Sequence, residues 1–200
     1  MKKIIAIAAL TAALASSSAF AKTEGNYVGI DFLKTSVTNR YQSSGGKAAG
    51  YEKFDNTSNG VGVNYKHAIN FNDVFVAPGV FFDRLGSEAT DVDGGTLSTQ
   101  SRYGAKLDVG YDVNENFSAY VTNGLAHVKY NINLPSNSTS TGAEISYFYG
   151  AGLSTKITKD LSLNVEYNTQ TLSIATPKIT GADHIKSKLN VAKLGLSYNF

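Results

Sequence analysis

Eight segments of this chain alternate apolar and non-apolar side chains at every second residue, and this alternation constrains the fold more than any other feature. The clearest case is the segment 101–113, where Tyr103, Leu107 and Tyr111 oppose Lys106 and Asp108. Successive side chains of a β-strand point to opposite faces, so a period of two indicates a strand with two unlike faces. The predicted strands are 27–37, 60–69, 74–85, 101–113, 117–130, 144–157, 161–172 and 189–200.

The lengths of the connections between these segments alternate strictly. Three connections are short and polar, and they contain residues 70–73, 114–116 and 158–160. Tight polar connections of this kind close β-hairpins. The other four are long and rich in Ser, Thr, Asn and Gly; they comprise residues 38–59, 86–100, 131–143 and 173–187. Short turns at one end and long loops at the other are typical of an outer-membrane barrel. We therefore predict an all-β fold, an eight-stranded antiparallel up-and-down transmembrane β-barrel.

One face of the predicted strands is apolar and the other carries charges. In a soluble barrel the apolar face points inward, whereas here we expect it to point outward into lipid. The non-apolar face carries charges of both signs, which can pair inside a narrow lumen, and glycines that leave room for them. These charges are Asp31, Lys66, Asp83, Lys106, Asp108, Asp112, Lys156, Glu166 and Lys193. The apolar face then contacts lipid, where every backbone polar group needs a partner and the sheet must close. Tyrosines on that face suit the aromatic girdles at the membrane surfaces: Tyr65, Tyr103, Tyr111, Tyr147, Tyr149 and Tyr198.

The alternative fold is a secreted lipocalin-like barrel or a two-sheet sandwich with its apolar face inward. Two features argue against it: short and long connections alternate strictly, and an exported chain of this kind has no cysteine for disulfides. The charged face fits either fold. Pro78 lies within the strand predicted over 74–85, where it cannot donate a ladder hydrogen bond. We expect a β-bulge or local kink there.

The first 21 residues have the pattern of a secretory signal peptide. Two lysines precede an apolar stretch, and Ala19 and Ala21 form a small-x-small cleavage site before Lys22. We expect residues 1–21 to be a signal peptide and residues 22–200 to form the barrel domain. The whole chain has 18 basic and 16 acidic residues, so removal of the two signal lysines leaves 16 of each. No basic block remains, and a nucleic-acid partner is not supported.

The segments "YVGIDF", "FVAPGVFFD", "YGAGLSTKIT" and the closing "LGLSYNF" give the chain a family resemblance. It resembles the small outer-membrane β-barrels of Gram-negative bacteria, which include the membrane domain of outer-membrane protein A and opacity-type surface proteins. The resemblance implies a monomer in the cell outer membrane that contacts membrane lipid and lipopolysaccharide. It also implies that the alternating last strand resembles the signal read by the barrel-assembly machinery, here Leu194, Leu196, Tyr198 and Phe200.

The sequence gives only weak signals for a catalytic or metal-binding site. His67, His127 and His184 are separated in sequence, and His127-Val128-Lys129 does not match the His-x-Ser of barrel hydrolases. The segment 91–95 (DVDGG) resembles only the start of a calcium loop and lacks the distal Glu, so we interpret it as an acidic surface turn, with cation binding as the alternative. We expect no catalytic residues, cofactor or metal.

These observations favour a non-enzymatic barrel that acts in envelope structure or in surface contact, as an adhesin does. Its long loops would meet a host or environmental ligand. Two alternatives remain open: a small barrel enzyme that acts on lipid or peptide, and a narrow solute channel. An eight-stranded barrel has an interior that side chains just fill, which argues against a wide pore.

Overall fold

A computed structural model describes residues 22–43, 55–86, 90–92, 95–133, 139–175 and 182–200. Within these residues every regular element is a β-strand, and no helix long and apolar enough to cross a membrane occurs there. The strands are β1 (Gly25–Ser43), β2 (Asp55–Phe71), β3 (Val74–Arg84), β4 (Thr90–Val92), β5 (Gly95–Asp112), β6 (Phe117–Asn133), β7 (Thr139–Lys156), β8 (Leu161–Ala175) and β9 (Ala182–Asn199).

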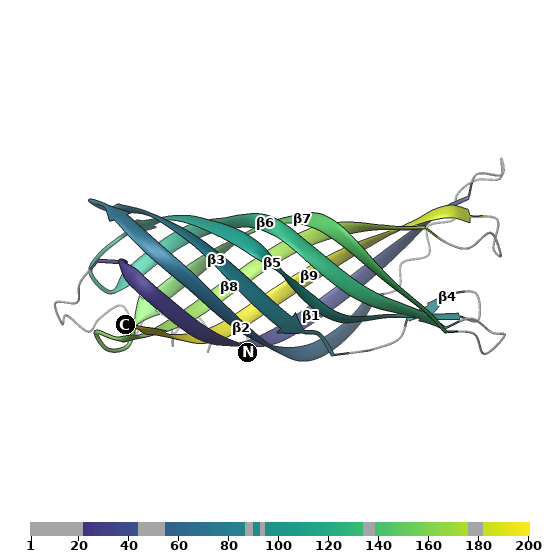
Figure 1. Cartoon of the computed structure of the whole chain (residues 1–200), viewed down its shortest axis with the longest axis horizontal. Helices are drawn as coiled ribbons and strands as arrows, with labels where there is room; N and C mark the ends of the chain where they lie inside the picture. Colours follow the sequence, from purple (N-terminus) through teal and green to yellow (C-terminus); the bar gives the residue numbers. More distant parts are fainter. Residues whose placement is uncertain (1–21, 44–54, 87–89, 93–94, 134–138, 176–181) are drawn as a thin grey trace, which may run out of the picture.

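Eight of these strands close into a barrel by pairing antiparallel with their neighbours in chain order. β3 pairs with β5, and the ring closes where β1 pairs with β9, for example Ile30 with Leu196. The C-terminus lies at the end of the barrel opposite to β4 (Figure 1). The predicted eight-stranded antiparallel barrel is confirmed, and closure leaves none of these eight strands with an open edge along its paired length.

The strands match the prediction at the short-turn end but extend further at the other end. β1 continues to Ser43 instead of Val37, and β9 begins at Ala182 instead of Leu189. The predicted loops are correspondingly shorter, and their central residues lie outside the described ranges. Backbone pairing needs no apolar face, so the ladder persists where the alternation that reveals it in the sequence has already ended. The short strand β4, which pairs with the start of β5, also lay within a predicted loop.

The three predicted turns are present, and their side chains fix them. Between β2 and β3 only Asn72 and Asp73 intervene, and Asn72 has a φ of 65°. Asn is among the few residues that adopt this left-handed conformation readily. Asn114 Oδ1 accepts the backbone N–H groups of Asn116 and Phe117, both at 2.9 Å. Thr158 Oγ1 accepts that of Leu161 at 3.1 Å.

The predicted bulge at Pro78 is absent. β3 runs without a register shift, and Pro78 pairs with Leu107 of β5. On the other side, the β2–β3 ladder skips two positions between the pairs Lys66–Gly79 and Ile69–Val76, with the register unchanged. The missing proline N–H therefore coincides with a local gap in the ladder but not with a shift in register.

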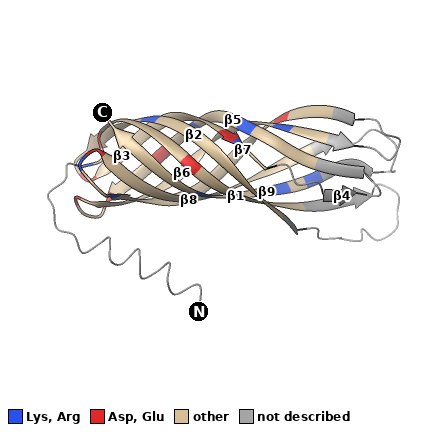
Figure 2. Cartoon of the chain, turned by 90° about the horizontal axis from the view of Figure 1, so that it is seen from below, with Lys and Arg blue, Asp and Glu red and all other residues tan. Residues whose placement is uncertain are grey.

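The two faces of the barrel are inverted as predicted. The side chains of Lys106, Asp108 and Glu166 are 8%, 0% and 5% exposed, although all three are charged. The outer wall carries the apolar residues, including Ile30, which is 62% exposed. The six tyrosines predicted for the apolar face all point outward. Acidic and basic residues of β-strands are spread along the barrel (Figure 2).

The lumen also holds apolar side chains, in three separate clusters. The first contains Phe81, Ala126, Val128, Phe148 and Leu172, the second Tyr27, Ala68, Phe75, Ala77 and Tyr120, and the third Leu33, Leu85, Leu189 and Val191. These clusters contact the charged side chains: Arg102 and Lys193 both lie over the Phe81 ring, at 5.3 and 5.0 Å from its centroid.

Candidate functional site

Asp83 anchors the first of two charged groups in the lumen. It is fully buried on β3 and accepts hydrogen bonds from Arg102 Nε of β5 at 2.7 Å and from Lys193 Nζ of β9 at 2.9 Å. Lys193 Nζ also lies 3.5 Å from Asp31 Oδ2 of β1. Four strands thus contribute to one cluster. Arg102 is the ladder partner of Asp83 on the neighbouring strand, whereas Lys193 reaches Asp83 across the barrel interior.

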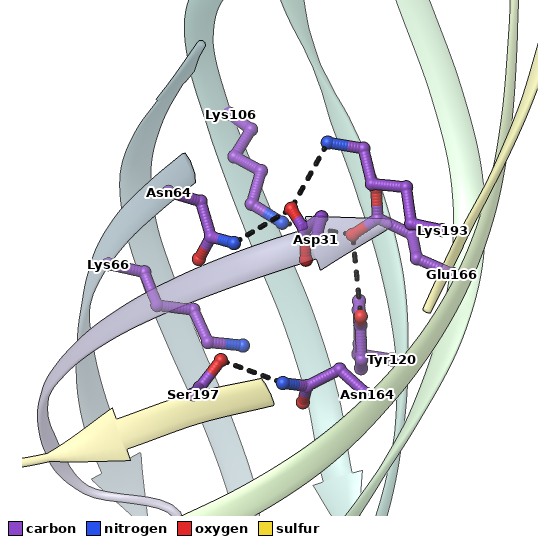
Figure 3. Close-up of a pocket in the computed structure, with 9 residues that line it drawn as sticks. All are labelled: Asp31, Asn64, Lys66, Lys106, Tyr120, Asn164, Glu166, Lys193 and Ser197. Atoms are coloured by element: carbon purple, nitrogen blue, oxygen red, sulfur yellow. Dashed lines mark hydrogen bonds and ion pairs between the residues drawn. The ribbon is translucent and has the colours of Figure 1, made fainter. Parts of the chain in front are cut away.

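Lys106 is at the centre of the second charged group, which lies nearer the short-turn end of the barrel. Its Nζ is 2.9 Å from Glu166 Oε2 and 3.2 Å from Asp108 Oδ2, and Lys66 Nζ is 3.3 Å from the same Asp108 oxygen. The Tyr120 hydroxyl donates to Glu166 Oε2 at 3.3 Å. The ring of Tyr120 also faces Lys66 Nζ, at 5.0 Å from its centroid. Figure 3 shows Lys66, Lys106, Tyr120 and Glu166 converging from different strands.

Amide side chains connect the two groups into one network. Arg102 Nη1 donates to Asn168 Oδ1 at 2.9 Å and to Gln170 Oε1 at 3.1 Å. Asn168 Nδ2 then donates to Glu166 Oε1 at 2.8 Å. A buried charge is tolerated only when it is paired and hydrogen-bonded. In the described lumen the buried charges balance: the cations are Lys66, Arg102, Lys106, Lys156 and Lys193, and the carboxylates are Asp31, Asp83, Asp108, Asp112 and Glu166.

Members of both groups line a cavity of about 20 Å³. Asp31, Lys66, Tyr120 and Glu166 are among the side chains that line it (Figure 3). This volume holds roughly one water molecule. Around this cavity the side chains therefore occupy most of the interior, as expected for eight strands.

The residues before β1 fold across the mouth of the barrel at the short-turn end. Thr23 donates to Asp112 through its backbone N–H at 3.0 Å and through its hydroxyl at 2.6 Å. Asp112 also accepts hydrogen bonds from Ser118 Oγ at 2.6 Å and from Asn70 Nδ2 at 2.9 Å. Asp112 is 6% exposed, and these four donors satisfy its buried carboxylate.

Two inward glycines make room for aromatic rings. A Cβ at Gly152 would overlap the Tyr120 ring, and one at Gly110 would overlap Phe75. This confirms that glycines on the charged face suit a crowded interior.

The structure does not bring the three histidines together. His67 points outward from β2, with Nδ1 2.9 Å from Asn26 Oδ1. His127 lies on the outer wall of β6, where its ring is 4.8 Å from that of Tyr103. His184 belongs to β9 rather than to a loop, and its side chain is outside the described ones.

The acidic segment 91–95 contributes to the β4–β5 hairpin, where Asp91 pairs with Thr96. Residues 93–94 lie outside the described residues, so the interpretation of this segment as an acidic surface turn stays a prediction. Its side chains lie outside the described ones. The part of the chain whose side chains are described contains no group of three His, Cys, Asp or Glu residues that could hold a metal ion.

The predicted assembly residues lie on the outer face of the closing strand. Leu194, Leu196, Tyr198 and Phe200 are all exposed, and the backbone N–H of Phe200 donates to Asn26 O at 3.0 Å. That the barrel-assembly machinery recognises these four residues stays a prediction. Ala19 and Ala21 lie outside the described residues, so cleavage before Lys22 also stays a prediction.

Sequence reasoning missed several members of the lumen network. Arg102 lies on the same alternation as Lys106 and Asp108, so the period of two could have placed it inside. Asn168 and Gln170 follow Glu166 on the inward face in the same way. Thr23 lies before the first strand, and no periodicity marks it.

Comparison with known proteins agrees with this geometry. The family of the outer membrane protein β-barrel domain matches residues 6–200. Among solved structures, Ail, the attachment invasion locus protein of Yersinia pestis, is 21% identical, with a TM-score of 0.57; the match covers 89% of this chain and 100% of Ail. Neisserial surface protein A is 16% identical, with a TM-score of 0.59 and coverages of 88% and 97%. OprG of Pseudomonas aeruginosa is 13% identical, with a TM-score of 0.53 and coverages of 90% and 98%. No curated protein matches the sequence. The chain therefore belongs to the outer membrane protein β-barrel domain family.

Proposed function

We propose that this protein is a non-enzymatic surface protein of the outer membrane, in which the barrel is a scaffold and the long connections make contact with an external ligand. The observation that carries the proposal is the crowded lumen, in which Asp83 pairs with Arg102 and Glu166 with Lys106 beside a cavity of about 20 Å³. A lumen of this kind supports the fold. Function is then left to the long-loop end of the barrel.

The described residues give less support to an enzyme. A nucleophilic site needs a base within hydrogen-bond reach of the nucleophile. His67 and His127 point outward from strands that are not neighbours, and the hydrogen bond of His67 is to Asn26. The carboxylates of the lumen are bound to cations and amides, which leaves them poorly placed to accept a substrate proton.

One of the related structures suggests a probe for surface contact. Ail has been solved in complex with the heparin analogue sucrose octasulfate; in that comparison it is 21% identical, with a TM-score of 0.56. A likeness at this identity concerns the fold. It nevertheless makes a sulfated glycan a reasonable first ligand to test on this protein.

The test compares the wild-type protein with a variant whose connections 44–54, 87–94, 134–138 and 176–181 are replaced by short Gly-Ser links. Both are displayed on a strain that lacks the protein, and binding to heparin-coated and epithelial surfaces is measured. We expect the variant to lose adhesion while it still shows heat-modifiable migration on gels. A matched control replaces only the turn residues 114–116, which should leave adhesion intact. Equal adhesion by the loop variant would refute the proposal.

The two alternative functions have direct assays. Steady single-channel conductance of the purified wild-type protein in planar bilayers would favour a solute channel. A change in lipid or peptide modification on deletion of the gene, restored by the wild type but not by His127→Ala or His184→Ala, would favour an enzyme. We expect silent bilayers and an unchanged modification pattern.

A further inference from the structure

Asn123 lies on the outer wall of β6, in the middle of the apolar band that contacts lipid. It pairs with Leu107 of β5 on one side and with Tyr149 of β7 on the other. Leu107 is four residues from Tyr103 and four from Tyr111, and both tyrosines point outward. Outward tyrosines at the two ends of a strand mark the two membrane surfaces. Asn123 is therefore near the centre of the hydrocarbon.

The side-chain amide of Asn123 has little hydrogen bonding within its own barrel. Thr122 is 1% exposed and faces the lumen, so Asn123 faces outward. Among the described residues its amide forms one hydrogen bond, from Nδ2 to the carbonyl oxygen of Leu107, and at 3.4 Å this bond is long. A carboxamide has two N–H donors and an oxygen with two lone pairs. Most of these groups face lipid tails, which offer no partner, and a polar group without a partner is costly there.

Other polar side chains of the outer wall bind to one another. Asn26 Oδ1 of β1 lies 2.9 Å from His67 Nδ1 of β2. Thr169 Oγ1 of β8 donates to Asn190 Oδ1 of β9 at 2.8 Å. Each of these pairs is formed by adjacent strands of one molecule. Asn123 differs from them, because within the described outer wall its amide contacts only a backbone carbonyl.

The wall around Asn123 allows close approach of another surface. Two alanines flank it diagonally: Ala105 of β5 pairs with Leu125, and Ala151 of β7 pairs with Val121. Both alanines are exposed, as are Val121 and Leu125. In membranes, small residues let two backbones approach closely, and a polar side chain at such a contact can form hydrogen bonds across it. β5, β6 and β7 therefore present a patch of small and apolar residues around one amide.

We propose that two copies of this protein associate in the membrane through this patch, with their Asn123 amides hydrogen-bonded to each other across a two-fold axis. A carboxamide is self-complementary, because the N–H of each copy can donate to the oxygen of the other. This property favours a second copy over a partner of different chemistry. The dimer departs from the monomer that the family resemblance implies. It rests on membership in the outer-membrane barrel family and is independent of the ligand contact proposed for the long connections.

The test measures association of the protein folded into lipid vesicles, from the fraction of linked dimer at increasing lipid-to-protein ratio. The chain has no cysteine, so Val121→Cys introduces a single thiol beside the contact, and a bifunctional maleimide can link two copies. We expect no linkage from Ile30→Cys, which places the thiol on β1, where Ile30 is 62% exposed. In the Val121→Cys background, Asn123→Leu removes both hydrogen bonds and should raise the dissociation constant about tenfold. Asn123→Gln keeps an amide and should retain most of the association.

The matched control is Thr169→Val, which also removes a polar group from the outer wall and should leave the dissociation constant unchanged. Heat-modifiability shows whether each variant is folded. If Asn123→Leu folds poorly, Ala151→Phe provides the test, because the larger side chain separates the two walls and leaves the amide in place.

A monomeric wild type, or equal association of the wild type and Asn123→Leu, would overturn the proposal. An equal loss in Thr169→Val would also overturn it, because association would then depend on the outer wall in general. Linkage of Val121→Cys in cells to another membrane protein, but not to a second copy, would overturn the choice of partner.

Discussion

Removal of the Asp83 carboxylate tests whether the lumen network stabilises the barrel. Asp83 is fully buried and holds two cations, Arg102 Nε at 2.7 Å and Lys193 Nζ at 2.9 Å. Removal of one partner of a buried ion pair costs about 3–5 kcal/mol. We expect Asp83→Ala to be near the lower limit, because Arg102 keeps its bonds to Asn168 and Gln170. The folding equilibrium constant should fall roughly 100-fold.

The measurement is a urea titration of protein folded into lipid vesicles, with the folded fraction taken from heat-modifiability on gels. The control is Asp73→Ala, because the Lys22–Asp73 pair at 2.8 Å is about half exposed on both sides. An exposed pair contributes about 0–1 kcal/mol, so this variant should behave nearly as the wild type does. A second comparison replaces Asp83 with Leu and Arg102 with Met together. Because Lys193 keeps Asp31 at 3.5 Å and Arg102 no longer leaves a buried charge, we expect this exchange to restore part of the lost stability.

The result that would refute this reasoning is a loss below about 1 kcal/mol for Asp83→Ala, similar to that of Asp73→Ala. It would mean that water or neighbouring groups replace the carboxylate without cost. The lumen would then be a hydrated interior rather than a packed ionic core.

Three further outcomes follow from particular residues. Val63→Arg places a charge on the outer wall, where Val63 is 52% exposed; it should cost about 2–4 kcal/mol in the same vesicle titration, whereas a soluble barrel would tolerate it. Asn72→Ala should destabilise the protein by about 1 kcal/mol because φ is 65° there, while Asn72→Gly should not, and equal losses would contradict the turn argument. Deletion of Phe200 should lower the amount of folded barrel in the outer membrane of cells but not refolding into vesicles; a normal yield in cells would refute an assembly role.

The sequence by itself determined the number, order and direction of the barrel strands and the inversion of their faces. These properties are encoded locally, because the side-chain period of two is visible in segments such as 101–113 and the short turns fix each hairpin. The alternation ends where the outer wall stops being apolar, so the sequence could not show that β1 continues to Ser43 or that β9 begins at Ala182. Backbone pairing, which has no side-chain signature, decides those limits.

Only the tertiary structure decided which lumen charges meet. Asp83 and Arg102 are ladder partners on β3 and β5, so their ion pair depends on register, whereas Lys193 of β9 meets Asp83 because its long side chain reaches across the closed ring. Closure also brings Thr23 to Asp112, 89 positions apart in the chain. The alternation assigns a residue to a face but carries no information about its partner on the opposite wall. Such partners become fixed when the last strand pairs with the first.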